Sequence, residues 1–155
     1  FLIKYIPGFT NAYVLDTACQ IGPRESRRIM GDYVLTGEDV LEGRRFADGI
    51  ARGAYPSDIH GPDGGLVHRH IKDGRDYHIP YRCLTPKGLE NILVAGRCIS
   101  CDRIALGSVR VMAQCMATGE AAGTAAALAV AKARTPRSMG GDAVVESLKE
   151  HGAIL

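Results

Sequence analysis

The residues with the clearest chemical potential follow an apolar segment and lead into a helix rich in small residues. Residues 91–95 read N-I-L-V-A, and Gly96 and Arg97 come directly after them. A loop then leads to Gly107 and Ser108, where the pattern predicts the start of the helix. A helix N-terminus has unpaired N–H groups and the positive end of the dipole, so it attracts anionic or carbonyl-rich ligands. The pattern predicts a ligand site here; the alternative is a strand–turn–helix unit whose glycines serve packing alone.

Arginines supply a second group of candidates. Arg110 would lie in the first turn of that helix, where a cation opposes the dipole, so we expect its side chain to reach toward a negative group. Arg24 and Arg27, close to Glu25, could hold an anionic substrate such as a carboxylate. A surface salt-bridge cluster explains the same residues equally well.

Four histidines fall in a loop-rich stretch together with several aspartates: His60, His68, His70 and His78. Imidazoles two residues apart suit a metal ion on an extended segment, but no tight three-ligand spacing emerges and we assign no metal ligand. A metal-dependent enzyme that uses this loop is one alternative function. His60 and His78 are also candidates for acid–base catalysis or substrate binding.

Two further pairs of residues carry reactive groups. Tyr81 and Arg82 alternate on a segment expected to be extended, so only one of them can face a ligand, and each is a candidate catalytic residue. Cys98 and Cys101 have the spacing of a redox dithiol. Two reduced thiols are the simpler interpretation, because the motif lacks the strand-then-helix placement of a thioredoxin-like site.

Composition restricts the class of protein. The chain has 155 residues, of which 46% are hydrophobic and 23% charged, as expected of one globular domain or a piece of a larger one. A net charge of +2 argues against nucleic acid as the main partner.

Five scattered cysteines are unlike the framework of a small secreted domain and favour a cytoplasmic location. Arg110 and Glu120 interrupt the most apolar stretch, so we predict no membrane span. The first residue is Phe1, which favours a piece cut from a longer polypeptide.

The pattern of apolar and turn-forming residues predicts a mixture of strands and helices. Extended segments are expected at residues 12–19, 28–35, 77–84 and, as a buried central strand, 91–95. Helices are expected from a cap at Thr36 to a stop at Gly53, from Ser108 to Lys132, and near Asp142 to His151. Alanine at every fourth position of the long helix would let it lie very close to a sheet or another helix. Met112 and Met116 on that helix are expected to fill the core.

Several of these segments resemble the FAD-dependent oxidoreductase family, which is related to the succinate dehydrogenase and glutathione reductase flavoprotein superfamily. The resemblance is specific from residue 79 to 127 and looser from about residue 11 onward. The specific segments are 79–84 (I-P-Y-R-C-L), 86–88 (P-K-G), 91–100 (N-I-L-V-A-G-R-C-I-S), 105–112 (A-L-G-S-V-R-V-M) and 115–127 (C-M-A-T-G-E-A-A-G-T-A-A-A). The looser ones are 23–29 and 35–60.

The resemblance implies an α+β (mixed α/β) fold that is part of a two-domain flavoprotein. Residues 1–84 would form the substrate-side portion. Residues 85–155 would form the C-terminal segment of the FAD-binding domain, with its last strand and long helix. Gly96 would approach the ribityl and phosphate part of FAD, and Arg97, where many relatives have an acid, suits a phosphate contact.

The resemblance also assigns a cofactor role to the start of the long helix. Gly107, Ser108, Val109 and Arg110 would face the pyrimidine edge of the flavin and stabilise negative charge on the reduced ring. The family's His-Glu pair is replaced here by Arg103 and Ile104, so its role cannot be transferred.

No G-x-G-x-x-G motif follows a strand in the 155 residues. We therefore expect an upstream FAD-binding half of the same polypeptide, without which this chain binds FAD weakly or not at all and is inactive. The expected function is the C-terminal portion of an FAD-dependent dehydrogenase that transfers a hydride between a small organic substrate and flavin. A non-catalytic binding or interaction module that lacks the cofactor half is the other alternative, and a homo-oligomer is compatible with either.

Overall fold

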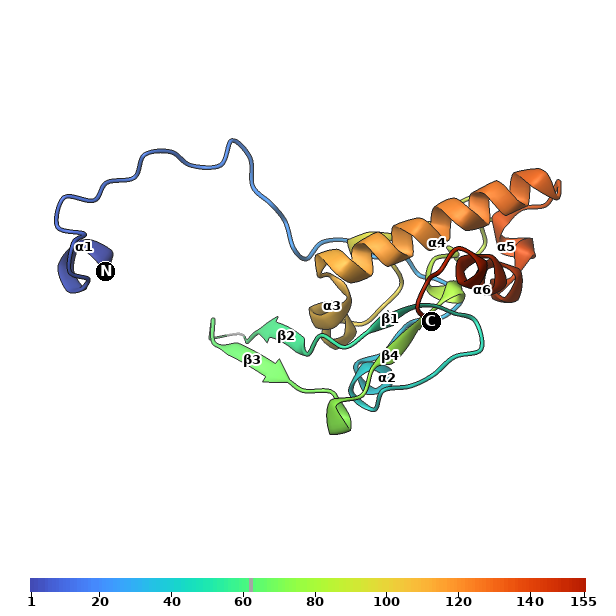
Figure 1. The fold of residues 1–155 in the computed structure, drawn as a ribbon, viewed down its shortest axis with the longest axis horizontal. Coiled ribbons are helices and arrows are strands. Elements are labelled where there is room, and N and C mark those ends of the chain that lie inside the picture. Colours follow the sequence, from blue (N-terminus) through green and yellow to red (C-terminus); the bar gives the residue numbers. More distant parts are fainter. Residues whose placement is uncertain (62) are drawn as a thin grey trace.

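The computed structural model describes residues 1–61 and 63–155, which form an α+β fold (Figure 1). The helices are α1 (Leu2–Tyr5), α2 (Gly37–Leu41), α3 (Arg103–Val109), α4 (Met112–Ala131), α5 (Pro136–Met139) and α6 (Gly141–Glu150). The strands are β1 (Gly49–Gly53), β2 (Ser57–His60), β3 (Leu66–Arg69) and β4 (Tyr77–Pro80). Three single 3₁₀ turns are η1 (Lys72–Gly74), η2 (Tyr81–Cys83) and η3 (Gly96–Cys98).

The strands form two separate antiparallel pairs. β1 pairs with β4, so that Gly53 lies opposite Tyr77, and β2 pairs with β3, so that His60 lies opposite Leu66. The extended segment expected at 77–84 is confirmed for its first half only, because η2 follows Pro80. Pro80 ends its strand, where a missing N–H costs little.

The cap at Thr36 is confirmed, but the helix that it begins is much shorter than expected. Thr36 Oγ1 accepts a hydrogen bond from the Asp39 N–H at 3.1 Å, and Asp39 Oδ2 accepts one from the Thr36 N–H at 3.0 Å. Helix α2 ends at Leu41, and Gly43 then adopts a positive φ of 67°. The prediction of a helix up to Gly53 was wrong, because residues 49–53 instead form β1 and bury their apolar side chains against β4.

The long helix expected from Ser108 is in fact two helices. Asp102 caps α3 by accepting a hydrogen bond from the Ala105 N–H at 2.7 Å. The helical conformation is interrupted after Arg110, because Val111 has extended backbone angles and α4 begins at Met112. The prediction that Gly107 and Ser108 open the long helix was therefore wrong, since both lie inside α3.

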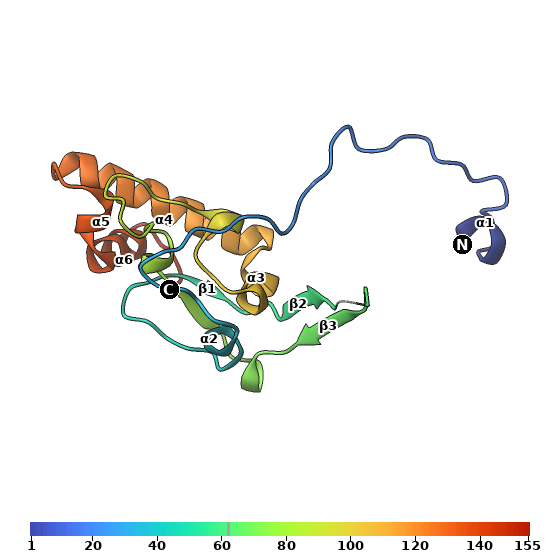
Figure 2. The same ribbon diagram turned by 180° about the vertical axis from the view of Figure 1, so that it is seen from behind.

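Helix α4 lies across the β1–β4 sheet and contacts α5 and α6 (Figures 1 and 2). Its buried face consists of Gln114, Thr118, Ala121, Ala125 and Ala129. The expected close packing is thus confirmed at Ala121, Ala125 and Ala129, whereas Ala113 is exposed. Met112 and Met116 are exposed, so the expectation that they fill the core was wrong. The amphipathic helix near the C-terminus is confirmed as α6, with Val144 and Leu148 buried.

Three of the expected strands form no sheet among the described residues. Residues 12–19 are irregular, and the N-terminal segment with α1 extends away from the rest of the protein (Figures 1 and 2). Residues 91–95, expected as a buried central strand, form no strand among the described residues, and Ile92 is 48% exposed. The segment expected at 28–35 makes only isolated bridges, from Gly31 to Pro86 and from Leu35 to Cys101.

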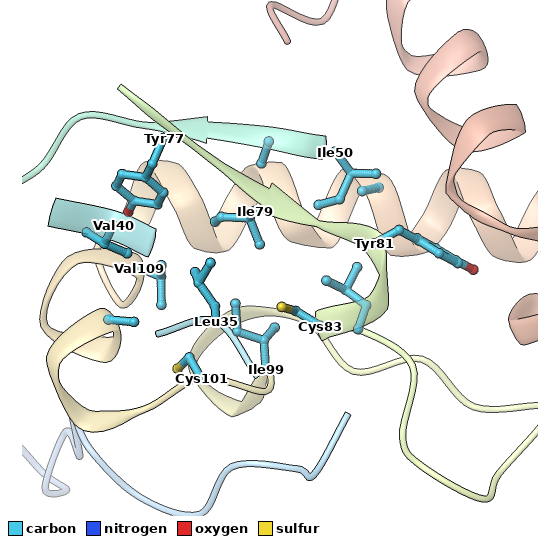
Figure 3. Packing of buried hydrophobic residues seen from close by; sticks show 14 of the residues in the cluster. Leu35, Val40, Ile50, Tyr77, Ile79, Tyr81, Cys83, Ile99, Cys101 and Val109 are labelled. Carbon is cyan, nitrogen blue, oxygen red and sulfur yellow. The ribbon is translucent and has the colours of Figure 1, made fainter. Parts of the chain in front are cut away.

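One hydrophobic core joins the sheet, α3 and the buried face of α4 (Figure 3). It draws residues from both sides of residue 84, such as Leu35 and Ile79 on one side and Ile99 and Val109 on the other. Among the described residues, no helix has the length and apolar character needed to cross a lipid bilayer.

Candidate functional site

Arg110 is the centre of a group of charged side chains. Its side chain is only 6% exposed, forms an ion pair with Glu25, and donates a hydrogen bond from Nη2 to the carbonyl oxygen of Asp58 at 2.7 Å. The expectation that Arg110 reaches a negative group is confirmed, but the reason given for it was wrong. Arg110 is the C-cap residue of α3, where a cation complements the helix dipole.

Other residues extend this group into an arginine cluster, which we define as Arg24, Glu25, His60, Arg103 and Arg110. Arg103 Nη2 donates to the carbonyl oxygen of His60 at 2.7 Å, and Arg103 Nε lies 3.9 Å from the Glu25 carboxylate. Arg24 Nη2 lies 3.5 Å from His60 Nε2. Arg103 and Arg110 both contact Glu25, and Arg24 adds a third guanidinium group to the cluster. Three cations against one carboxylate leave a positive excess, so this surface suits an anionic ligand.

The structure thus brings together three residues that the sequence singled out separately: Arg24, His60 and Arg110. Arg27 is exposed and makes none of the hydrogen bonds or ion pairs found among the described residues. Sequence reasoning missed Arg103 as a member. Asp102 is a recognisable N-cap, and it would have placed Arg103 in the first turn of a helix that packs on β2.

Arg97 connects this cluster to the start of α4. Its Nε donates to the carbonyl oxygen of Arg110 at 3.3 Å, and its Nη1 donates to that of Pro23 at 3.3 Å. The preceding Gly96 has a positive φ of 71° and donates its N–H to Thr118 Oγ1 on α4 at 3.0 Å. The loop that follows residues 91–95 is therefore held against both α4 and the segment that carries Arg24.

The start of α4 has donors available for a ligand. Its N-cap residue, Val111, makes no side-chain capping hydrogen bond, so the N–H groups of the first turn are free of that interaction. Gln114, three residues into the helix, has a buried Oε1 atom without a hydrogen-bond partner among the described residues. Unpaired N–H groups beside the Arg97 guanidinium fit the phosphate and carbonyl oxygens of a nucleotide cofactor.

Gly107, Ser108 and Val109 lie behind this surface and are buried. A Cβ atom on Gly107 would lie 2.7 Å from Ser57 Oγ and 2.8 Å from Ile59 Cγ2, so glycine allows α3 to lie against β2. Ser108 Oγ donates to the carbonyl oxygen of Tyr55 at 2.5 Å. A cofactor role for these residues stays a prediction, and the structure gives them a part in packing the end of α3.

His78 lies in a different place from His60, on β4 rather than β2. Its Nε2 is 2.6 Å from Arg45 Nη1, and its Nδ1 is 3.1 Å from the carbonyl oxygen of Phe46. Burial lowers the pKa of His78, and the nearby arginines lower it further against the opposing effects of Phe46 and Asp76. The described residues contain no group of three or more His, Cys, Asp or Glu side chains arranged to hold a metal ion.

Tyr81 and Arg82 lie beside α5 and α6, and only Arg82 is exposed to solvent. Tyr81 is buried, its hydroxyl donates to the carbonyl oxygen of Pro136 at 2.7 Å, and burial raises its pKa to about 12. Arg82 forms a two-point ion pair with Asp48, at 2.9 and 3.1 Å, and stacks on the Tyr33 ring. Both line an open crevice of about 330 Å³ that also includes Arg137.

The two cysteines with redox-motif spacing have different surroundings. Cys98 is exposed, whereas Cys101 is buried in the core and burial raises its pKa to about 12 (Figure 3). Cys98 is the last residue of η3, and the extended Ile99 and the buried Ser100 lie between it and Cys101.

Comparison with known proteins identifies one family. The model of the family described as "FAD dependent oxidoreductase" matches residues 1–149. No curated protein matches the chain. No solved structure matches it either.

Proposed function

The chain belongs to the FAD dependent oxidoreductase family, and we propose that it is the C-terminal portion of a dehydrogenase that transfers a hydride between an organic substrate and flavin. FAD is the cofactor that the family implies, and it supplies the two-electron chemistry when bound. The observation that carries the proposal is the position of Arg97. Its guanidinium binds the Arg110 carbonyl at the junction of α3 and α4, between an uncapped helix start and the arginine cluster.

Residues of this chain would contribute to the cofactor side in two ways. Arg97 and the first-turn N–H groups of α4 would hold phosphate and carbonyl oxygens, and Gly96 lets the loop turn close to them. Gly107, Ser108 and Val109 would support this surface from behind. Arg110, which is held by Glu25, would fix the angle between α3 and α4.

On the substrate side, we assign binding of an anionic group to Arg24 and Arg103. Arg27, three residues after Arg24 in the sequence, stays a candidate for the same role. His60 is the histidine placed to move a proton there, since its ring is exposed and its Nε2 faces Arg24. Three other candidates for catalysis have side chains that bind other groups elsewhere on the protein. His78 contacts Arg45, the Tyr81 hydroxyl donates to the carbonyl oxygen of Pro136, and Arg82 pairs with Asp48.

The proposal includes an upstream FAD-binding half in the same polypeptide and the division of this chain at residue 84. The exposed Ile92 supports the upstream half, because a neighbouring strand would cover its side chain. A reducing, cytoplasmic environment is also part of the proposal, and five free cysteines are compatible with it.

Replacement of Arg97 tests the cofactor assignment in the full-length protein. R97Q should weaken FAD binding by roughly tenfold or more, because it removes a charge-assisted contact to phosphate. R75Q is the matched control, since Arg75 is an exposed arginine in the turn at η1. Equilibrium dialysis with FAD measures both variants, and wild-type affinity in R97Q would refute the assignment.

The 155-residue chain on its own tests the need for an upstream half. We expect it to purify without the visible absorption of flavin and to bind added FAD weakly. A yellow chain that carries one flavin per molecule would contradict this part of the proposal. For the substrate side, anaerobic reduction of the full-length flavoprotein by simple carboxylates should be slower in H60Q than in the wild type.

A further inference from the structure

We propose that Cys98 and Cys115 are a pair of thiols that closes to a disulfide and fixes η3 to the first turns of α4. This inference does not depend on flavin binding. The sequence points instead to Cys98 and Cys101, which are three residues apart. The geometry of the loop after Gly96 favours Cys115 as the partner.

The loop that carries Cys98 lies directly on Cys115. A Cβ atom placed on Gly96 would be 3.9 Å from both the Cβ and the Sγ of Cys115. Cys98 is two residues further along, in the same 3₁₀ turn, which packs against α4. A disulfide requires the two Cβ atoms to be about 3.5–4.5 Å apart, and η3 is a single short turn that would close onto Cys115 to reach this separation.

One carbonyl oxygen fixes the position of the Cys115 thiol. Arg110 O accepts a hydrogen bond from Arg97 Nε at 3.3 Å and from Cys115 Sγ at 3.5 Å. The thiol therefore lies beside the guanidinium of the residue that precedes Cys98. The ionisable groups that face Cys115 are Arg97 on the loop and Cys98 itself.

These surroundings give the two thiols different roles. Burial raises the pKa of Cys115, and Cys98 raises it further, while Arg97 lowers it. Cys115 is thus mostly protonated at neutral pH and half-buried, whereas Cys98 is the thiol exposed to an oxidant in solution. The exposed Cys98 would attack an oxidant such as glutathione disulfide, form a mixed disulfide, and release one glutathione. Cys115 would then attack Cys98, lose its proton, and release the second glutathione.

The other buried cysteines are poorer partners for Cys98. Cys101 is in the hydrophobic core, and burial raises its pKa to about 12, so it is neither accessible nor ionised. Cys83 is fully buried in the same core. Cys19 is exposed, but it lies in the extended N-terminal segment and serves as an internal control for an ordinary exposed thiol.

The test is oxidation of the reduced full-length protein by glutathione disulfide, followed by proteolysis and peptide mass mapping. We expect a peptide that links Cys98 to Cys115, and a molecule that has lost two hydrogens without gaining glutathione at Cys98. Cys19 should carry glutathione instead. A link from Cys98 to Cys101, or a lasting glutathione adduct at Cys98 in the wild type, would overturn the proposal.

Single substitutions separate the two roles. Loss of Cys115, in C115S and C115A, should convert the intramolecular link into a stable glutathione adduct at Cys98. C98S should abolish the link and leave Cys115 largely unmodified. C101S should form the link in the same yield as the wild type, and loss of the link in C101S with retention in C115A would refute the assignment.

Discussion

Arg110 and Glu25 form an ion pair between residues 85 positions apart, with the guanidinium almost completely buried and the carboxylate 31% exposed. The pair fastens the segment after the extended N-terminus to the junction of α3 and α4. A buried guanidinium is tolerated only where it is paired and hydrogen-bonded, and the backbone carbonyl oxygen of Asp58 supplies a second acceptor. Glu25 therefore determines whether this junction keeps its geometry.

Removal of the Glu25 charge should destabilise the protein. E25Q leaves the buried Arg110 with a neutral partner, which we expect to lower the free energy of unfolding by about 1–3 kcal/mol. D73N is the control, since it removes an ion pair between two exposed side chains, Asp73 and Arg75, which is worth about 0–1 kcal/mol. Urea unfolding followed by circular dichroism measures both. Equal effects of the two variants would contradict the special role of the buried pair.

Substitution of glycine by alanine should destabilise the protein in α3 and stabilise it in α4. G107A places a methyl group 2.7 Å from Ser57 Oγ and 2.9 Å from the backbone nitrogen of Asp58, so we expect a loss of about 1–3 kcal/mol in the free energy of unfolding. G119A and G123A meet nothing within 4 Å and should stabilise α4 by about 0.5–1 kcal/mol each. Thermal unfolding of the three variants measures these changes in stability. A stabilising G107A would show that α3 is not held tightly against β2.

Asp39 should make stability depend on acid pH. Burial disfavours its charge, but hydrogen bonds from Thr36, Tyr33 and Arg44 outweigh this and hold its pKa below 3.8. Because the folded pKa is below the unfolded one, the stabilisation is complete above pH 3.8 and is lost as the pH falls through the folded pKa.

The variant D39N checks this dependence. We expect it to lose about 1–2 kcal/mol at neutral pH, because the charged acceptor of the capping box and the partner of Arg44 are both removed. The difference from wild type should shrink below pH 3.8, as the wild-type carboxylate becomes protonated. Urea midpoints across an acid pH series give the result, and a difference that stays constant with pH would exclude Asp39 as its cause.

Helix caps and apolar periodicity could be predicted from the sequence. Features that depend on a distant segment of the same chain could not. The side chains of Thr36 and Asp39 each accept a hydrogen bond from the backbone of the other residue, so the cap depends on only four consecutive residues. Helix α6 has a clear apolar face. Both features were therefore recognisable in the sequence. Ile50 and Ala51 also fit a helical spacing. Pairing of their segment with β4, which comes later in the chain, makes it a strand.

The candidate site was predictable residue by residue but not as an arrangement. Arg24, His60 and Arg110 were each identified from their chemistry, yet their association depends on how the segment near Glu25 crosses β2 and α3. The error in the helix start arose because Ser108 is as good an N-cap by type as Asp102. Asp102 is the residue that caps α3, and Ser108 lies inside this helix, where its hydroxyl contacts Tyr55 and Tyr77.

A new cap at Val111 would test the start of α4 as a cofactor site. Val111 has extended backbone angles (φ −73°, ψ 159°), which suit an N-cap serine, so V111S should satisfy first-turn N–H groups and raise the free energy of unfolding by about 0.5–1 kcal/mol relative to V111A. The serine oxygen would then compete with a bound nucleotide for the same donors. We therefore expect the full-length V111S protein to bind FAD more weakly than V111A, although it is the more stable of the two. Equilibrium dialysis and thermal unfolding measure the two quantities separately, and equal FAD affinity in a stabilised V111S would mean that these N–H groups do not contact the cofactor.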